Sequence, residues 1–168
     1  MFFLVDFLNS VEPSDQSYFQ NFLKQDKIRN IINVGNRTFN DGSKVETFMK
    51  EDFGKSVTDQ LIEVIRNYKV LLYNGQLDII VAPVFTENFL SKLKWEGVNS
   101  YLKAPKKIWK VNRNDAEVAG YVKSVVKNSQ KQFHYVTVRS AGHILPFDKP
   151  REAQDLLRRF INNRLQED

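Results

Sequence analysis

Residues 14–67 have apolar side chains at the spacing of amphipathic helices. Aromatic and leucine side chains follow the capping residues Ser14 and Asp15 at intervals of three and four positions. Isoleucines continue this spacing until Gly35, a residue type that commonly ends a helix. A further helix is predicted over 57–68. The pattern therefore predicts a mainly helical segment from residue 14 to residue 67.

The spacing changes at residue 69, where a short and almost continuously apolar run begins. Residues 69–73 precede the turn pair Asn74-Gly75, and their hydrophobicity is typical of a strand buried on both faces of a parallel sheet. The next elements are a helix that opens at a proline, two strands of an antiparallel excursion, a strand rich in β-branched residues and a last helix. These lie at 83–93, 108–111, 120–126, 133–138 and from Pro150 onward. Strands alternating with helices predict an open α/β sheet.

Two predicted loops leave the carboxyl ends of the strands, where open α/β sheets carry their chemistry. Residues 74–81 contain Asp78, and residues 139–150 contain His143. An aspartate that orients an imidazole, and a histidine that takes a proton from a serine, are the acid and base of a serine-hydrolase triad. In α/β-hydrolases the chain order is serine, acid, histidine. We expect Asp78 and His143 to meet in this way, the alternative being a turn residue and a structural histidine.

The serine of such a triad is absent from this sequence. α/β-hydrolases carry it in a Gly-x-Ser-x-Gly turn. Ser56 has Gly54 two positions before it but no glycine two positions after, and Ser140 has only the glycine that follows, Gly142. We therefore expect this chain alone to be catalytically inert.

The residues around the two loops closely resemble the acid and histidine segments of serine carboxypeptidases. These segments read Tyr-Asn-Gly-Gln-Leu-Asp at 73–78 and Arg-Ser-Ala-Gly-His-Ile-Leu-Pro-Phe-Asp-Lys-Pro at 139–150. Residues between them fall at the family's landmark positions: Trp95, Gly97, Tyr101, Ala104, Trp109, Ala119, Gly120 and Tyr121. Residues 34–42 most resemble the vitellogenic-like branch of that family. The resemblance extends over residues 9–164.

The resemblance implies a fold and a domain organisation. The chain would be the C-terminal portion of an α/β-hydrolase fold, with an incomplete central sheet and flanking helices. Residues 1–56 would form the end of the cap insertion and the return to the core, and residues 57–168 the last strands and helices. The family's oxyanion hole and most of its central sheet have no counterpart in this sequence. We therefore expect a truncated or processed C-terminal segment, for which Met1 is not the natural start.

The resemblance also implies an activity. A complete enzyme would release single residues from peptide C-termini through an acyl-enzyme, with Asp78 as the orienting acid and His143 as the general base. Ile144, where many members carry methionine, would lie near the substrate. The expected partners are peptide C-termini and an N-terminal chain that carries the nucleophile, or a second copy of this chain. The alternative is a non-catalytic remnant that binds a peptide or a partner and exposes strand 69–73 as an apolar edge.

Composition removes several other kinds of site. There is no cysteine, so disulfides, thiolate metal sites and cysteine nucleophiles are excluded, and two histidines alone argue against zinc. No cofactor is expected. His134 is expected to be a partly buried, hydrogen-bonded strand residue, and Asp148 to fix the loop after His143 rather than to take part in chemistry.

The charge distribution raises nucleic-acid binding as a further alternative. The net charge is +5, and residues 92–113 contain seven basic residues and one acid, interleaved with two tryptophans and a tyrosine that could stack on bases. We expect instead a solvated surface around two core tryptophans, and no nucleic acid as a partner, because the overall charge is far below that of dedicated nucleic-acid-binding proteins.

Membrane and targeting signals are sparse. No stretch has the length of a transmembrane helix, and the apolar start of the chain lacks the basic residues of a signal peptide. Asn36 begins the N-glycosylation sequon Asn-Arg-Thr. By resemblance we expect a secreted or lysosomal (endomembrane) protein that does not bind a membrane.

Overall fold

The computed structural model of the chain describes residues 18–37, 39–40 and 42–166. The chain divides between Val57 and Thr58 into two compact units, each of which is described by itself. The smaller unit contains the described residues from 18 to 57, and the larger unit contains residues 58–166. The predicted capping residues Ser14 and Asp15 lie outside the described part of the chain.

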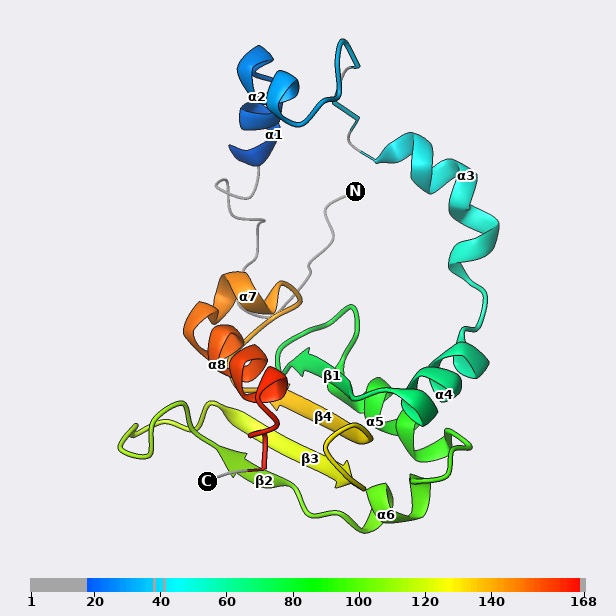
Figure 1. The fold of residues 1–168 in the computed structure, drawn as a ribbon, viewed down its shortest axis with the longest axis vertical. Coiled ribbons are helices and arrows are strands. Elements are labelled where there is room, and N and C mark those ends of the chain that lie inside the picture. Colours follow the sequence, from blue (N-terminus) through cyan, green and yellow to red (C-terminus); the bar gives the residue numbers. More distant parts are fainter. Residues whose placement is uncertain (1–17, 38, 41, 167–168) are drawn as a thin grey trace. The chain divides into compact units, whose positions relative to one another are not determined.

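The smaller unit consists of short helices joined by turns (Figure 1). They are α1 (Tyr18–Leu23), α2 (Asp26–Ile31) and α3 (Ser43–Phe53). The expected helix stop at Gly35 was wrong by two residues. Asn33, with φ 57°, takes the left-handed position that ends α2, because its backbone and that of Val34 donate to carbonyls of the last turn. None of the described residues of this unit is buried.

The larger unit is organised around a four-stranded sheet of order β1-β4-β3-β2 (Figure 1). The strands are β1 (Val70–Gly75), β2 (Lys107–Trp109), β3 (Gly120–Val126) and β4 (Gln132–Val138). β1 runs parallel to β4, while β3 is antiparallel to both β4 and β2. The predicted parallel pair and antiparallel excursion are therefore both confirmed.

Helices pack on both faces of this sheet. One face carries α4 (Thr58–Asn67), α5 (Pro83–Lys92) and α6 (Val98–Lys103), and the other carries α7 (Leu145–Asp148) and α8 (Pro150–Ile161). The alternation of β4 explains the two cores. Phe133 and Tyr135 pack against α4–α6, and Val136 and Val138 pack on the α8 side. This mixed sheet with flanking helices confirms the predicted α/β class.

The strand boundaries differ from the sequence prediction at the end of β1. Asn74 and Gly75 were assigned to a turn, but they pair with Thr137 and Val138 and continue the strand. The parallel partner therefore extends β1 by two residues beyond its apolar run. This extension brings the end of β1 level with the end of β4, where both functional loops begin.

No helix in the described part of the chain is long and apolar enough to cross a membrane.

Candidate functional site

The loops after β1 and β4 are hydrogen-bonded to each other directly beyond the sheet. The Gln76 amide donates to the Val138 carbonyl and the Leu77 amide donates to the Ala141 carbonyl, each at 2.8 Å. Gly75 lies against the same segment, and a Cβ at this position would overlap the carbonyl oxygens of Ala141 and of the next residue. The parallel register therefore places the acid loop and the histidine loop in contact.

Asp78 is buried and its carboxylate is held at both oxygens. Oδ1 accepts hydrogen bonds from the amides of Ile80 and Val81, each at 2.9 Å. Oδ2 lies 3.0 Å from Nδ1 of His143. Only 5% of Asp78 is exposed. A carboxylate fixed by backbone amides presents its other oxygen to the imidazole in one orientation.

His143 is oriented by Asp78 at one ring nitrogen, and its side chain is partly exposed. Because a carboxylate oxygen accepts at Nδ1, the neutral ring carries its proton there and leaves Nε2 as the acceptor. The side chain is 37% exposed, and Nε2 makes no hydrogen bond within the described residues. An imidazole held in this tautomer with a free Nε2 can remove a proton from a hydroxyl group.

The histidine loop is also fixed from its far side. Asp148, at the end of α7, accepts a 2.7 Å hydrogen bond at Oδ2 from the amide of Gly142, the residue before His143. Ser140 adopts φ 55°, and its amide lies 3.4 Å from Oε1 of Gln76. The prediction that Asp148 fixes this loop is confirmed.

Sequence reasoning missed the part that Asn74 plays in shaping the acid loop. Asn74 is buried, donates from Nδ2 to the Val81 carbonyl at 2.8 Å, and accepts at Oδ1 from the Tyr135 hydroxyl at 3.1 Å. The amide thus ties the end of the Asp78 loop to β4. The available signal in the sequence was an asparagine directly before Gly75, and it was interpreted as a turn residue.

Two further predicted positions lie at the surface. Ile144 follows His143, caps the start of α7 and is 39% exposed, so its contact with substrate stays a prediction. Asn36 is exposed in the smaller unit, while Thr38 of its sequon lies outside the described residues. Exposure is compatible with glycosylation, which also stays a prediction.

The second histidine is hydrogen-bonded, as expected, but it is buried more completely than the sequence predicted. His134 is 1% exposed, and its two ring nitrogens contact Ser124 Oγ at 2.7 Å and Gln132 Oε1 at 2.9 Å. Burial lowers the pKa of His134 to about 4, with a smaller effect from Lys69. No group of three or more His, Asp or Glu side chains among the described residues is arranged to hold a metal ion.

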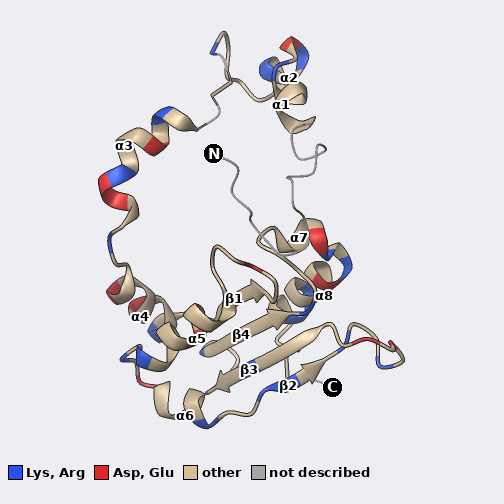
Figure 2. Cartoon of the chain, turned by 180° about the vertical axis from the view of Figure 1, so that it is seen from behind, with Lys and Arg blue, Asp and Glu red and all other residues tan. Residues whose placement is uncertain are grey.

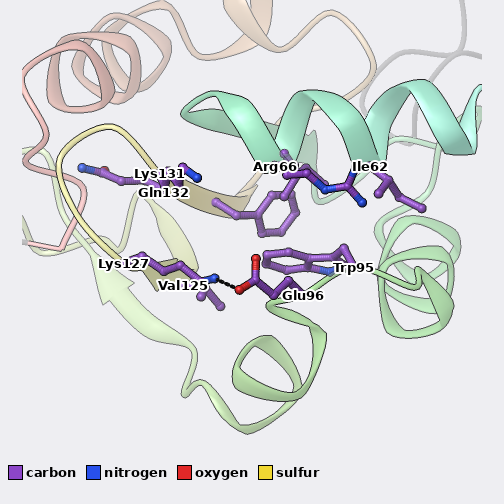
Figure 3. Close-up of a pocket in the computed structure, with 10 residues that line it drawn as sticks. Ile62, Arg66, Trp95, Glu96, Val125, Lys127, Lys131 and Gln132 are labelled. Atoms are coloured by element: carbon purple, nitrogen blue, oxygen red, sulfur yellow. Dashed lines mark ion pairs between the residues drawn. The ribbon is translucent and has the colours of Figure 1, made fainter.

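A hollow between α4 and the start of β4 lies at the opposite end of β4 from His143 (Figure 3). Its walls include Trp95 and Phe133, and the Glu96–Lys127 ion pair, at 2.6 Å, borders it. Its volume is about 40 Å³, room for two or three water molecules but not for an amino-acid residue. We therefore do not assign a substrate site to it.

In the basic segment between residues 92 and 113, two of the three aromatic rings that could stack on bases are buried. Its lysines and arginine lie along the path from α5 through α6 to β2 (Figure 2), and most are exposed. However, Tyr101 is only 2% exposed and Trp109 only 4% exposed, so neither ring can stack on a base. Trp109 is a core residue as expected, whereas Trp95 is half-buried.

Comparisons with known proteins converge on one family. The family profile described as serine carboxypeptidase matches residues 4–163. The "Probable serine carboxypeptidase CPVL" of Pongo abelii is 50% identical over 156 residues, which cover 93% of this chain and 32% of that protein. The "Venom serine carboxypeptidase" of Apis mellifera is 43% identical over 161 residues, covering 95% and 33%.

The fold has a counterpart among solved structures. The Kex1 prohormone-processing carboxypeptidase of Saccharomyces cerevisiae superposes with a TM-score of 0.66 at 22% identity, over 90% of this chain and 32% of that one. The structure therefore matches part of an α/β-hydrolase-type carboxypeptidase fold. The chain spans about a third of the length of the curated relatives it matches.

Proposed function

Because the chain belongs to the serine carboxypeptidase family, we propose that it supplies the acid and the base of a serine-type carboxypeptidase. Asp78 is the orienting acid and His143 the general base. The observation that carries this assignment is the 3.0 Å contact between Asp78 Oδ2 and His143 Nδ1, on a partly exposed side chain whose Nε2 makes no hydrogen bond within the described residues. Family membership alone would not select these two side chains.

The proposed reaction is acyl transfer from the last peptide bond of a substrate. A serine outside these 168 residues gives its hydroxyl proton to His143 Nε2 as its oxygen attacks the carbonyl carbon. The imidazolium, stabilised by Asp78, then gives the proton to the departing amino group, and the C-terminal residue leaves. Water attacks the acyl-enzyme by the same route and regenerates both groups. Without that serine the chain is inert.

The open edge of β1 is the place we propose for the segment that carries the serine. Among the described strands, β1 pairs only with β4, so its other edge offers free backbone groups to a further strand. Apolar side chains on β1 and the segments directly before and after it are 44–65% exposed: Tyr68, Tyr73, Ile80 and Val81. A separate N-terminal chain or the preceding part of a longer polypeptide can bind there, whereas a second copy of this chain would give a dimer without a nucleophile.

The test is a chimera in which this chain replaces the matching third of the Pongo abelii relative, to which it is 50% identical. We expect the chimera to release C-terminal residues from a blocked dipeptide. His143→Ala and Asp78→Asn should each lower kcat by about 10⁴-fold, because the base or its tautomer is lost. Asp59→Asn, an exposed carboxylate on α4, is the matched control and should leave kcat unchanged.

Three outcomes would each contradict a part of this proposal. Full activity of the His143→Ala chimera would remove His143 from the reaction. Hydrolysis by the 168-residue chain alone, abolished by His143→Ala, would disprove its inertness. A chimera that folds and binds the dipeptide without cleaving it would favour the alternative of a non-catalytic peptide-binding protein.

We propose a secreted or lysosomal location for the complete protein. The exposed Asn36 and the similarity to a venom serine carboxypeptidase support a route through the secretory pathway. In secreting cells, N-glycosidase should lower the apparent mass of the chimera by one more glycan than that of its Asn36→Gln variant. Equal shifts for the two proteins would rule out use of this site.

A further inference from the structure

The backbone on either side of His143 is enclosed by two contacts of a single residue. Asp148 Oδ2 accepts from the Gly142 amide at 2.7 Å, and the Asp148 amide donates to the Ile144 carbonyl at 3.1 Å. One contact precedes the histidine and the other follows it. The loop from 142 to 148 is thereby closed at both sides of His143, which is exposed.

The rest of the loop gives Asp148 a fixed position from which to act. Pro146 and Pro150 fix φ on either side of Asp148, at the starts of α7 and α8. Leu145 anchors α7 in the core at 2% exposure. A carboxylate accepting from a backbone amide forms a stronger hydrogen bond than a neutral acceptor. Asp148 is therefore set rigidly against the peptide that carries His143.

The two aspartates near His143 have different targets. Asp78 contacts the imidazole ring, whereas Asp148 contacts the peptide before it and makes no hydrogen bond to the ring within the described residues. The imidazole of His143 can keep its hydrogen bond to Asp78 only while the loop backbone stays in position. Small displacements of a catalytic group lower rates steeply, because the attacking geometry is lost.

We propose that Asp148 is a positioning residue for His143, acting through the Gly142 peptide. The effect of Asp148 on catalysis rests on the proposed function. The structural part of the proposal, that Asp148 holds the His143 imidazole in position, does not depend on that function. Asp148→Ala removes the acceptor, while Asp148→Asn keeps an oxygen that can accept from Gly142. Comparison of the two variants therefore separates the effect of losing the hydrogen-bond acceptor from the effect of losing the negative charge.

Nuclear magnetic resonance of the 168-residue chain tests the structural part. In the unmodified chain, we expect a slowly exchanging Gly142 amide and a downfield His143 Nδ1 proton. Asp148→Ala should broaden or abolish the imidazole signal, and Asp148→Asn should retain it. Asp115→Asn is the matched control, because Asp115 also accepts from a loop amide, that of Asn112. The control should leave the imidazole signal unchanged.

The catalytic part is tested in the chimera. Asp148→Ala should lower kcat by 10- to 100-fold with KM within about twofold, and Asp148→Asn should restore kcat to within about fivefold. An unchanged imidazole signal in folded Asp148→Ala would overturn the proposal. If that variant does not fold, free exchange of the Gly142 amide in the unmodified chain would overturn it as well. An inactive chimera with the expected imidazole signals would instead contradict the proposed function.

Discussion

Gly75 is the residue at which β1 and the histidine loop approach most closely. The atoms that an added Cβ would meet are backbone carbonyl atoms of Ala141 and Gly142, which cannot rotate away as a side chain can. The requirement for glycine at this position is therefore one of space. It follows that the packing of Asp78 and His143 depends on a residue that takes no part in the chemistry.

We expect Gly75→Ala to lower the free energy of unfolding by about 2–3 kcal/mol, because the added methyl group overpacks the junction of the two loops. Urea denaturation measures this loss, and kcat of the chimera should fall with it. Gly54→Ala is the matched control, since nothing lies within 4 Å of its Cβ position, and should change stability by less than about 0.5 kcal/mol. Equal effects of the two substitutions would contradict the crowding argument.

At the scale of elements, α8 is tied to β2 by a buried carboxylate. Asp155 is 3% exposed and accepts from Trp109 Nε1 at 3.0 Å, Arg159 Nε at 2.7 Å and Arg158 at 2.8 Å. Burial raises the pKa of Asp155, but the hydrogen bonds from Arg158, Trp109 and Arg159 outweigh it and hold the pKa below its usual value. The charge is thus fully compensated inside the core.

Asp155→Ala should destabilise the chain by about 3–5 kcal/mol, because it removes the buried acceptor that Trp109 Nε1 and Arg159 Nε share. Arg158→Ala is the control: its side chain is 69% exposed, and we expect a loss below about 1 kcal/mol. Thermal or urea unfolding, followed by the fluorescence of the tryptophans, gives both values. Comparable losses in the two variants would show that the Trp109 contact contributes little.

The elements that sequence periodicity predicted are those whose own residues determine them. β3 and β4 are rich in β-branched and aromatic residues, and α8 presents Ala153 and Leu156 on one face. Each end that was predicted for these three elements lies within one residue of the observed end. The extension of β1 through Asn74 depends on pairing with a strand far along the chain. No local pattern encodes such a partner, so the prediction ended two residues early.

The same division holds for the site. Asp78 and His143 were found for two reasons. Their flanking residues resemble those of a family, and both lie in loops that follow predicted strands. The hydrogen bond between the Ser140 amide and Gln76 Oε1 joins two segments that are far apart in sequence, and no pattern in either segment predicts it. A single sequence does not predict hydrogen bonds between residues that lie far apart along the chain.

At the scale of the whole larger unit, a polar network that is buried at His134 and exposed at Asn163 links β3 and β4 to the residue before β1 and to the end of α8. His134 joins Ser124 to Gln132, and Gln132 Nε2 contacts Asn163 Oδ1 at 3.2 Å. Lys69 Nζ donates to the same Asn163 oxygen and to carbonyls at the end of α8. The neutral imidazole is favoured in the middle of this network, because burial lowers the pKa of His134 and the nearby charge of Lys69 lowers it further.

Stability should therefore depend on pH through His134. Its pKa is about 4 in the folded chain against 6.5 in a model peptide, so the unfolded chain binds the proton more readily. This contribution to stability is present above pH 6.5 and is lost as the pH falls towards 4, by about 3 kcal/mol in all. Urea unfolding at pH 7 and at pH 4 measures the change.

His134→Gln removes the ionisable group and serves as the comparison. The difference in stability between the variant and the unmodified chain should shrink as the pH falls from 7 to 4, because only the unmodified chain loses the imidazole contribution. A constant difference over this range would exclude His134 as the source. Carboxylates titrate in both proteins alike and cancel in the comparison.

The parallel register of β1 and β4 has a further consequence for how the chain reaches its final state. Asp78 and His143 are 65 positions apart, and the strands that carry them pair directly, with the excursion of β2 and β3 completed between them. Closing so long a loop is entropically costly, and non-local pairing is characteristic of slow folding. The acid–base pair should be among the last contacts to form during refolding, after the local β3–β4 hairpin. A chain arrested before that step would carry a complete hairpin and separated catalytic side chains.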